Sequence, residues 1–139
     1  KFKNLDCIQI PFNILDYRWN TIDFMKIKKK NKNLEIHARS IFLKGILPER
    51  IDLLPNWFKD KIKLRKKIND LEKLYKINFL KISFLYVYEQ KWIDKIVIGL
   101  SKKKQLENIY NFIVNKKKIN FNNNTFKFIP KKILMPKKW

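Results

Sequence analysis

The chain has 139 residues, a length that suits one domain and allows a hydrophobic core. Hydrophobic residues make up 45% of the sequence and aromatic residues 14%, which excludes an intrinsically disordered chain. No apolar run approaches the roughly 20 residues that are needed to cross a bilayer, so the sequence predicts no membrane-spanning helix.

The formal net charge of +21 allows two interpretations. The charge is either an electrostatic footprint for nucleic acid or another anionic surface, or the result of a compositional drift. The sequence also contains 21 Ile and 15 Asn, which nucleic-acid binding gives no reason to enrich. Because the lysines are also scattered over every segment, the compositional interpretation is favoured.

The sequence holds a single cysteine, Cys7, so no disulfide can form within it. This usage suits a reducing cytosol, and the first residues lead directly into strand-like sequence without a signal-peptide pattern. Both observations predict a cytoplasmic protein. Cys7 stands beside Ile8 in an apolar run and is predicted to pack in the core.

In chain order, residues 7–13 form the first predicted strand. Trp19, Ile22 and Met25 recur every three residues and predict a helix that continues into the basic segment 26–32. Residues 34–40 form the second predicted strand. Both strands have the nearly continuous apolar character that is typical of parallel strands covered on both faces.

The second half of the chain predicts three helices and one strand. An amphipathic pattern predicts a helix over residues 56–76, and Asn78 is a candidate cap for an almost wholly apolar helix over residues 79–89. Residues 93–99 form a third, β-branched strand. The last helix is marked by an apolar spacing of three and four at Leu106, Ile109, Tyr110 and Ile113.

This alternation of strands and helices predicts an α/β protein whose three strands lie parallel and adjacent in chain order. We find no internal repeat beyond it and no Gly/Ser-rich linker. The sequence therefore predicts one piece without an internal domain boundary.

Three blocks resemble the aldo/keto reductase family, in the branch of bacterial sugar and surface-polysaccharide oxidoreductases. Residues 39–47, RSIFLKGIL, are similar to the family's seventh-strand segment. The other two blocks are residues 8–18, IQIPFNILDYR, and residues 92–99, WIDKIVIG, followed by SKKKQLENI. The blocks stand in the family's order. The resemblance implies that residues 1–139 are a single partial domain, the C-terminal portion of a TIM (β/α)₈ barrel with about strands six to eight and their helices.

The two ends of the chain fit the same expectation. The first residue is Lys1 instead of Met, and residues 136–139, PKKW, resemble the family's own C-terminus. A fragment truncated at its front is therefore expected, because three strand–helix units of eight cannot close a barrel.

The resemblance also implies a nicotinamide cofactor, NADP or NAD. In the family, Gln9 would contact the carboxamide, and Arg39 would stand in place of an aromatic residue that stacks on the nicotinamide. Ser40 and the backbone at Phe42 would face the pyrophosphate. The expected 2′-phosphate loop, which opens the last helix, consists of Ser101, Lys102 and Lys103, with Gln105 near the position of the family's usual arginine.

The catalytic residues of the family are not in this sequence. The family's tyrosine acid and its Asp, Lys and His partners belong to the first half of the barrel. The only histidine, His37, lies inside a predicted strand and is interpreted as structural. We find no phosphate-binding glycine loop, no nucleophile elbow and no metal-ligand spacing. No catalytic or metal-binding residue is therefore predicted.

Two functions follow as expectations. The first is the cofactor-binding half of an NAD(P)H-dependent oxidoreductase that reduces a carbonyl substrate, such as a sugar-derived one, in the full-length protein. The alternative is a non-enzymatic, strongly basic binding module of a ribonucleoprotein particle. Its lysines would contact phosphates without reading sequence.

Overall fold

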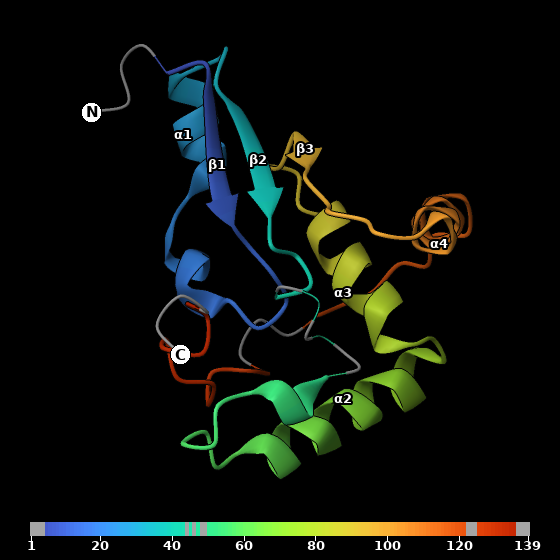
Figure 1. The fold of residues 1–139 in the computed structure, drawn as a ribbon. Helices are drawn as coiled ribbons and strands as arrows, with labels where there is room; N and C mark the ends of the chain where they lie inside the picture. The colour runs from blue at the N-terminus through green and yellow to red at the C-terminus, as the bar shows by residue number, and fades with distance from the viewer. Residues whose placement is uncertain (1–4, 44, 46, 48–49, 122–124, 136–139) are drawn as a thin grey trace.

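The computed structural model describes residues 5–43, 45, 47, 50–121 and 125–135. This part of the chain is a mixed α/β fold with a small parallel sheet, four α-helices and two short 3₁₀ helices (Figure 1). The elements are, in order, β1 (Cys7–Pro11), η1 (Tyr17–Thr21), α1 (Phe24–Lys30), β2 (Glu35–Arg39), η2 (Ile51–Leu53), α2 (Lys61–Tyr75), α3 (Phe79–Tyr88), β3 (Lys95–Ile96) and α4 (Lys103–Val114).

The three strands lie side by side in chain order, and both pairs are parallel, which confirms the predicted arrangement. Each strand is shorter than the apolar run that predicted it. Backbone pairing nevertheless continues past the strand ends, because the N–H of Phe12 donates to the carbonyl of Arg39 at 2.9 Å. The N–H of Val97 donates likewise to Ala38 at 2.8 Å. In Figure 1 the carboxyl ends of β1 and β2 point toward the side of the molecule where α2 lies.

The sheet buries only one of its faces. In β2, Ile36 and Ala38 are fully buried, whereas Glu35 and His37 are only partly buried. Alternate residues of a strand point to opposite faces of a sheet, so β2 presents one apolar and one polar face. The prediction of parallel strands covered on both faces is therefore wrong for this part of the chain.

Strand β1 repeats the alternation. Ile10 is buried on the core side, whereas Cys7 and Gln9 are exposed on the other side. The predicted packing of Cys7 in the core is wrong, because the residue occupies the open face of the sheet together with Gln9. We refer below to this surface, which carries Cys7, Gln9, Glu35, His37, Arg39 and Lys95, as the open face.

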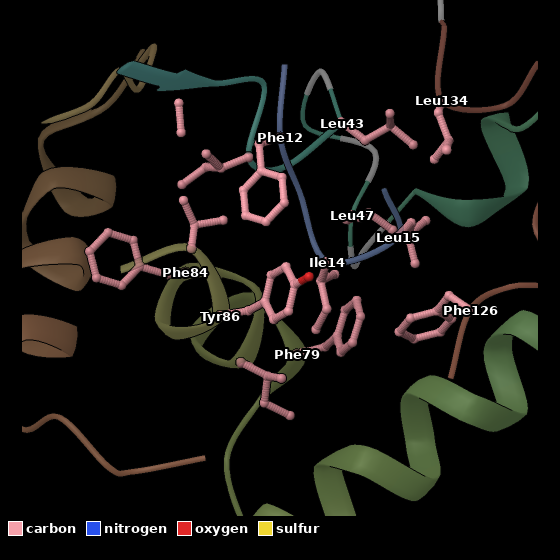
Figure 2. Close-up of a cluster of buried hydrophobic side chains, with 14 of the residues drawn as sticks. Phe12, Ile14, Leu15, Leu43, Leu47, Phe79, Phe84, Tyr86, Phe126 and Leu134 are labelled. Carbon is pink, nitrogen blue, oxygen red and sulfur yellow. The ribbon is translucent and has the colours of Figure 1, made fainter. Parts of the chain in front are cut away.

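Helix α3 lies at the centre of the hydrophobic core, as its apolar sequence predicts. The side chain of Asn78 caps it by accepting the N–H of Lys81 at 2.9 Å. Seven residues of α3 are buried: Phe79, Ile82, Ser83, Phe84, Leu85, Tyr86 and Val87. Figure 2 shows how side chains from the end of β1, the loop after β2 and the C-terminal segment gather around this helix. The core therefore joins segments from both ends of the chain.

An aromatic cluster links the sheet to two helices. The ring of Phe12 lies 5.4 Å from that of Tyr86 in α3 and 5.0 Å from that of Trp92, just before β3. The ring of Phe24 in α1 also stacks on that of Trp92 at 4.1 Å. Burial, helped by the charge of Asp16, raises the pKa of Tyr86 to about 12. These contacts fix α1 and α3 against the sheet.

Helix α2 begins later than the predicted range of residues 56–76. The chain first forms a turn in which the N–H of Phe58 donates to the carbonyl of Pro55 at 2.9 Å. The helix itself begins only after this turn, with Asp60 at the N-cap position. The core-facing residues of α2 are the predicted ones: Leu64, Ile68 and Leu71.

Helix α4 forms where it is predicted, but it packs with a different face. Its buried residue is Phe112, whose ring lies 5.9 Å from that of Phe84 in α3. An apolar stripe on the other side of the helix remains exposed, and it consists of Leu106, Tyr110, Ile113 and Val114. Three of the four residues that marked the helix in the sequence are in this exposed stripe, whereas Ile109 is partly buried against the core.

Over residues 5–43, 45, 47, 50–121 and 125–135, no helix combines the length and the apolar character that a bilayer span requires. The C-terminal residues 136–139, whose sequence resembles the reductases, lie outside the described residues.

Candidate functional site

The loop that follows β2 at the carboxyl edge of the sheet has an unusual backbone. Ser40 and Leu43 have positive φ angles of 57° and 45°, which side-chain-bearing residues adopt rarely, and Gly45 follows with 75°. The turn is closed by the N–H of Leu43, which donates to the carbonyl of Ser40 at 2.9 Å. Such outliers cost free energy and occur preferentially at functional sites.

Buried side chains hold this loop in place. Ile41, Leu43 and Leu47 are each at most 2% exposed, and Figure 2 shows the last two pointing into the core. Phe42, which lies between the first two, is only partly buried. These buried side chains anchor the described part of the loop, and the side chain of Phe42 stays partly exposed.

A pocket of about 340 Å³ lies between this loop and the start of α4. It collects the predicted cofactor residues Phe42, Lys102 and Gln105 at one place. The full lining consists of Phe42, Gly45, Leu47, Leu80, Gly99, Leu100, Lys102, Lys104, Gln105, Asn108 and Ile109. Both glycines of the sequence are in this lining, and so are two lysines, with no acidic residue among the described ones.

The side chain of Gln105 is exposed and bonds the backbone at the start of α4. Its side-chain oxygen accepts the N–H of Ser101 at 2.9 Å and the N–H of Lys102 at 3.1 Å. The hydroxyl of Ser101 donates to the same oxygen at 3.3 Å. The N–H groups of Ser101 and Lys102, two residues of the predicted 2′-phosphate loop, are thus already bonded, and an anion would have to displace the Gln105 side chain to reach them.

The structure does not bring the remaining predicted residues into the pocket. Lys103 is exposed and stands outside the lining, as does Ser101. Arg39 extends from the open face, and its guanidinium donates to the hydroxyl of Ser40 at 3.3 Å. Gln9 is exposed on β1, opposite His37 of β2. Of the predicted cofactor residues, Phe42, Lys102 and Gln105 are thus in the pocket and Gln9 and Arg39 are on the open face, whereas Ser40, Ser101 and Lys103 are in neither.

Sequence reasoning missed Lys104 and Asn108, which line the pocket from α4. These two residues are one helical turn apart and share a face of α4, and Asn108 also follows Gln105 by three positions. Helical spacing from Gln105 was the signal that identifies Asn108, and the same spacing from Asn108 identifies Lys104. Leu80 of α3 could not be predicted from the sequence, because only tertiary packing brings it to this pocket.

His37 was interpreted as a structural residue of a buried strand, but the structure places it on the open face. Its Nε2 lies 2.8 Å from a carboxylate oxygen of Glu35. Among the residues that the structure describes, no group of three His, Cys, Asp or Glu side chains is placed to hold a metal ion.

No family model matches the chain, and no curated protein matches it.

Proposed function

We propose that this chain supplies the cofactor-binding part of an aldo/keto reductase-like (β/α)₈ barrel. Its three parallel strands would be the sixth to eighth of that barrel. In the completed protein, NADPH or NADH would reduce a carbonyl substrate, such as a sugar-derived one. The sequence resemblance in three blocks suggests the family, and the pocket at the carboxyl edge of the sheet is the observation that carries the proposal.

The pocket is where an α/β protein binds ligands. It lies after the carboxyl ends of β2 and β3, the edge at which loops of parallel sheets form active sites. Its volume of about 340 Å³ is near the lower end for ligand pockets and suits part of a dinucleotide. Lys102 and Lys104 supply positive charge, which favours the phosphate-bearing part of such a ligand.

The unfinished sheet supports a larger assembly of strands. In the described chain, β1 and β3 each keep one edge without a strand partner. Free edges and an open sheet face are features that folded proteins usually cover. The exposed stripe of α4, which includes Leu106 and Tyr110, is a second surface that further strand–helix units would bury.

Within this proposal, each residue has a definite task. Gln9 and Arg39 on the open face would orient the nicotinamide, which supplies a hydride when the cofactor is bound. Ser40 and the backbone at Phe42 would hold the pyrophosphate. Lys102 and Lys104, in place of the predicted Lys102 and Lys103, would contact the adenosine phosphates. The proton donor for the carbonyl oxygen would come from the other half of the barrel.

Titration of the chain with NADPH, followed by tryptophan fluorescence, tests the cofactor site. Because the pocket offers the phosphate contacts, 2′-phospho-ADP-ribose should bind nearly as well as NADPH, whereas nicotinamide mononucleotide should bind far more weakly. No saturable response to either phosphate-rich ligand at millimolar concentration would contradict the proposal. In the parent gene, we also expect the reading frame to continue upstream with an Asp-x-x-x-Tyr segment.

A groove on α2 supports the alternative of a basic module that binds nucleic acid. The groove measures about 530 Å³, and four cationic side chains line it: Lys61, Arg65, Lys66 and Lys73. Asp52 and Asp70 are also in the lining and offset part of this charge. Binding of a DNA or RNA duplex that weakens steeply with salt, and that Arg65→Ala with Lys66→Ala reduces, would favour this function. Binding that this double variant leaves unchanged would count against this function.

A further inference from the structure

The open face carries a cluster of four polar side chains at its amino-terminal edge. The Sγ atom of Cys7 lies 3.4 Å from Nδ1 of His37. On the other side of the imidazole, Nε2 lies 2.8 Å from a carboxylate oxygen of Glu35. The ammonium group of Lys95 contacts the same carboxylate oxygen at 2.8 Å. A thiol, an imidazole and a carboxylate are thus connected in series.

The strand register builds this cluster. Cys7 of β1 is paired with Glu35 of β2, and His37 of β2 is paired with Lys95 of β3. Partner positions of neighbouring strands point to the same face, and so do residues two apart on one strand. The four side chains therefore converge because of where they stand in the sheet. They lie at the edge opposite the pocket that contains Phe42.

The arrangement is that of a nucleophile, a base and a group that orients the base. When Nε2 of His37 donates its proton to the ionised Glu35, Nδ1 is free to accept the proton of the Cys7 thiol. Hydrogen bonds from Lys95, which has the larger effect, and from His37 hold the pKa of Glu35 below its ordinary value. The carboxylate therefore stays negative and stabilises the imidazolium that forms when the thiol is deprotonated.

We propose that Cys7 is an activated thiol that forms mixed disulfides with small anionic disulfides, with His37 as its base. In this reaction, Nδ1 takes the thiol proton, and the thiolate attacks one sulfur of the disulfide. A new bond forms between Cys7 and that sulfur while the original S–S bond breaks. The released thiolate takes the proton from the imidazolium, so that one free thiol leaves and no electron acceptor is required.

The charges around the cluster explain the choice of an anionic disulfide. The side chain of Lys95 is 60% exposed beside the cluster, and Arg39 lies exposed on the same face. Among the described residues, the charges near it include the carboxylate of Glu35, which Lys95 and His37 contact, and that of Asp94, which Lys28 of α1 contacts. With a net charge of +21, the chain attracts small anions.

The sequence contains no second cysteine that could resolve the product. The mixed disulfide would therefore persist until an external thiol removes it, which makes Cys7 a reversible modification site. This inference does not depend on cofactor binding, because the cluster and the pocket lie at opposite edges of the sheet. In a completed barrel, Cys7 and Glu35 would stand at the rim of the amino-terminal end, since each is the first residue of its strand.

The test measures the reaction of the chain with the anionic disulfide 5,5′-dithiobis(2-nitrobenzoate) at pH 6. The urea-unfolded chain is the reference, because its thiol reacts without help and is almost wholly protonated at this pH. We expect the native chain to react at least about ten-fold faster than the unfolded one. A native rate that is equal to or below the unfolded rate would overturn the proposal.

Three variants test which side chains cause the faster reaction of the native chain. His37→Asn should remove the advantage at pH 6 and show a steeper rise in rate toward pH 8, whereas Glu35→Gln should lose part of it. Cys7→Ser should not react. Circular dichroism checks that each variant is folded, and the comparison of native with unfolded chain decides the question if His37→Asn does not fold. Oxidised glutathione should react faster than the neutral disulfide of 2-mercaptoethanol, and equal rates would overturn the anionic preference.

Discussion

Asp94 bonds the backbone of Ile36 with both its main chain and its side chain. Its own N–H donates to the carbonyl of Ile36 at 2.9 Å, and its carboxylate accepts the N–H of Ile36 at 2.8 Å. The same carboxylate contacts the ammonium group of Lys28 in α1. One residue before β3 thus ties the third strand to the second strand and to the first helix.

Asp94→Ala should destabilise the fold by about 1–2 kcal/mol, because the N–H of fully buried Ile36 loses its acceptor. The partial exposure of Asp94 keeps this estimate at the lower end for a charged hydrogen bond. Urea unfolding at neutral pH measures the change. Asp70→Ala, which removes an exposed carboxylate of α2, is the control and should change the free energy of unfolding by less than about 0.5 kcal/mol. Equal losses in the two variants would contradict this account.

The contribution of Asp94 should depend on pH in a definite direction. Burial alone would raise the pKa of Asp94, but the hydrogen bonds from Lys28 and from the N–H of Ile36 outweigh it and lower the pKa. A carboxylate with a lower pKa in the folded state stabilises the fold above its unfolded pKa of about 3.9 and loses this effect as the pH falls. The difference in free energy of unfolding between the unmodified chain and Asp94→Asn should therefore shrink from pH 7 to pH 3. A constant difference would show that the charge is not responsible.

Gly45→Ala should destabilise the chain by about 1–2 kcal/mol, because the φ angle of 75° disfavours any residue with a Cβ atom. No other atom lies within 4 Å of the position that the Cβ would take, so the cost comes from the backbone conformation alone. Gly99→Ala is the matched control in the same pocket. It also has open space and no positive φ angle, and it should leave stability unchanged or slightly raised. Thermal unfolding of the two variants distinguishes these outcomes.

The sequence predicted which segments pair, but not which sheet face is covered. Short apolar runs between helical patterns located all three strands, because period and length are local properties. The alternation of Glu35 and His37 with Ile36 and Ala38 was also present in the sequence. It was interpreted as part of a continuous apolar run, and Cys7 was consequently assigned to the core. Whether a second layer covers a sheet depends on other segments of the chain, and the sequence of one strand does not reveal where they pack.

The candidate site, too, could be predicted only in part from the sequence. Because carboxyl ends of adjacent parallel strands share one edge, Phe42 and Lys102 could be predicted to lie close together. Which residues of α4 face the pocket depends on how the helix is rotated against α3, and packing of Phe112 sets that rotation. Lys104 therefore lines the pocket in place of Lys103. The hydrogen bonds between Gln105 and the start of α4 likewise could not be predicted from residue spacing alone.

Substitution of the two pocket lysines tests whether the basic residues before and within α4 bind a cofactor. If Lys102 and Lys104 contact the 2′-phosphate, replacing both with Ala should weaken NADPH far more than NADH. Each lost charge-assisted hydrogen bond is worth about 1.5–3 kcal/mol, or about ten- to a hundred-fold in affinity. Replacing Lys103 alone should have little effect, because it is exposed and outside the pocket lining.

Lys116 and Lys117 are the matched control pair, since they follow α4 and are exposed outside the pocket. Their replacement with Ala should change the binding of either cofactor only slightly, because exposed charges contribute less than about 1 kcal/mol. Fluorescence titration of both double variants with both cofactors gives four affinities. A selective loss of NADPH binding in the Lys102 and Lys104 variant would assign the 2′-phosphate to this pocket. Similar small losses in all four would mean that the pocket lysines are solvated charge, and the assignment of NADP would then be wrong.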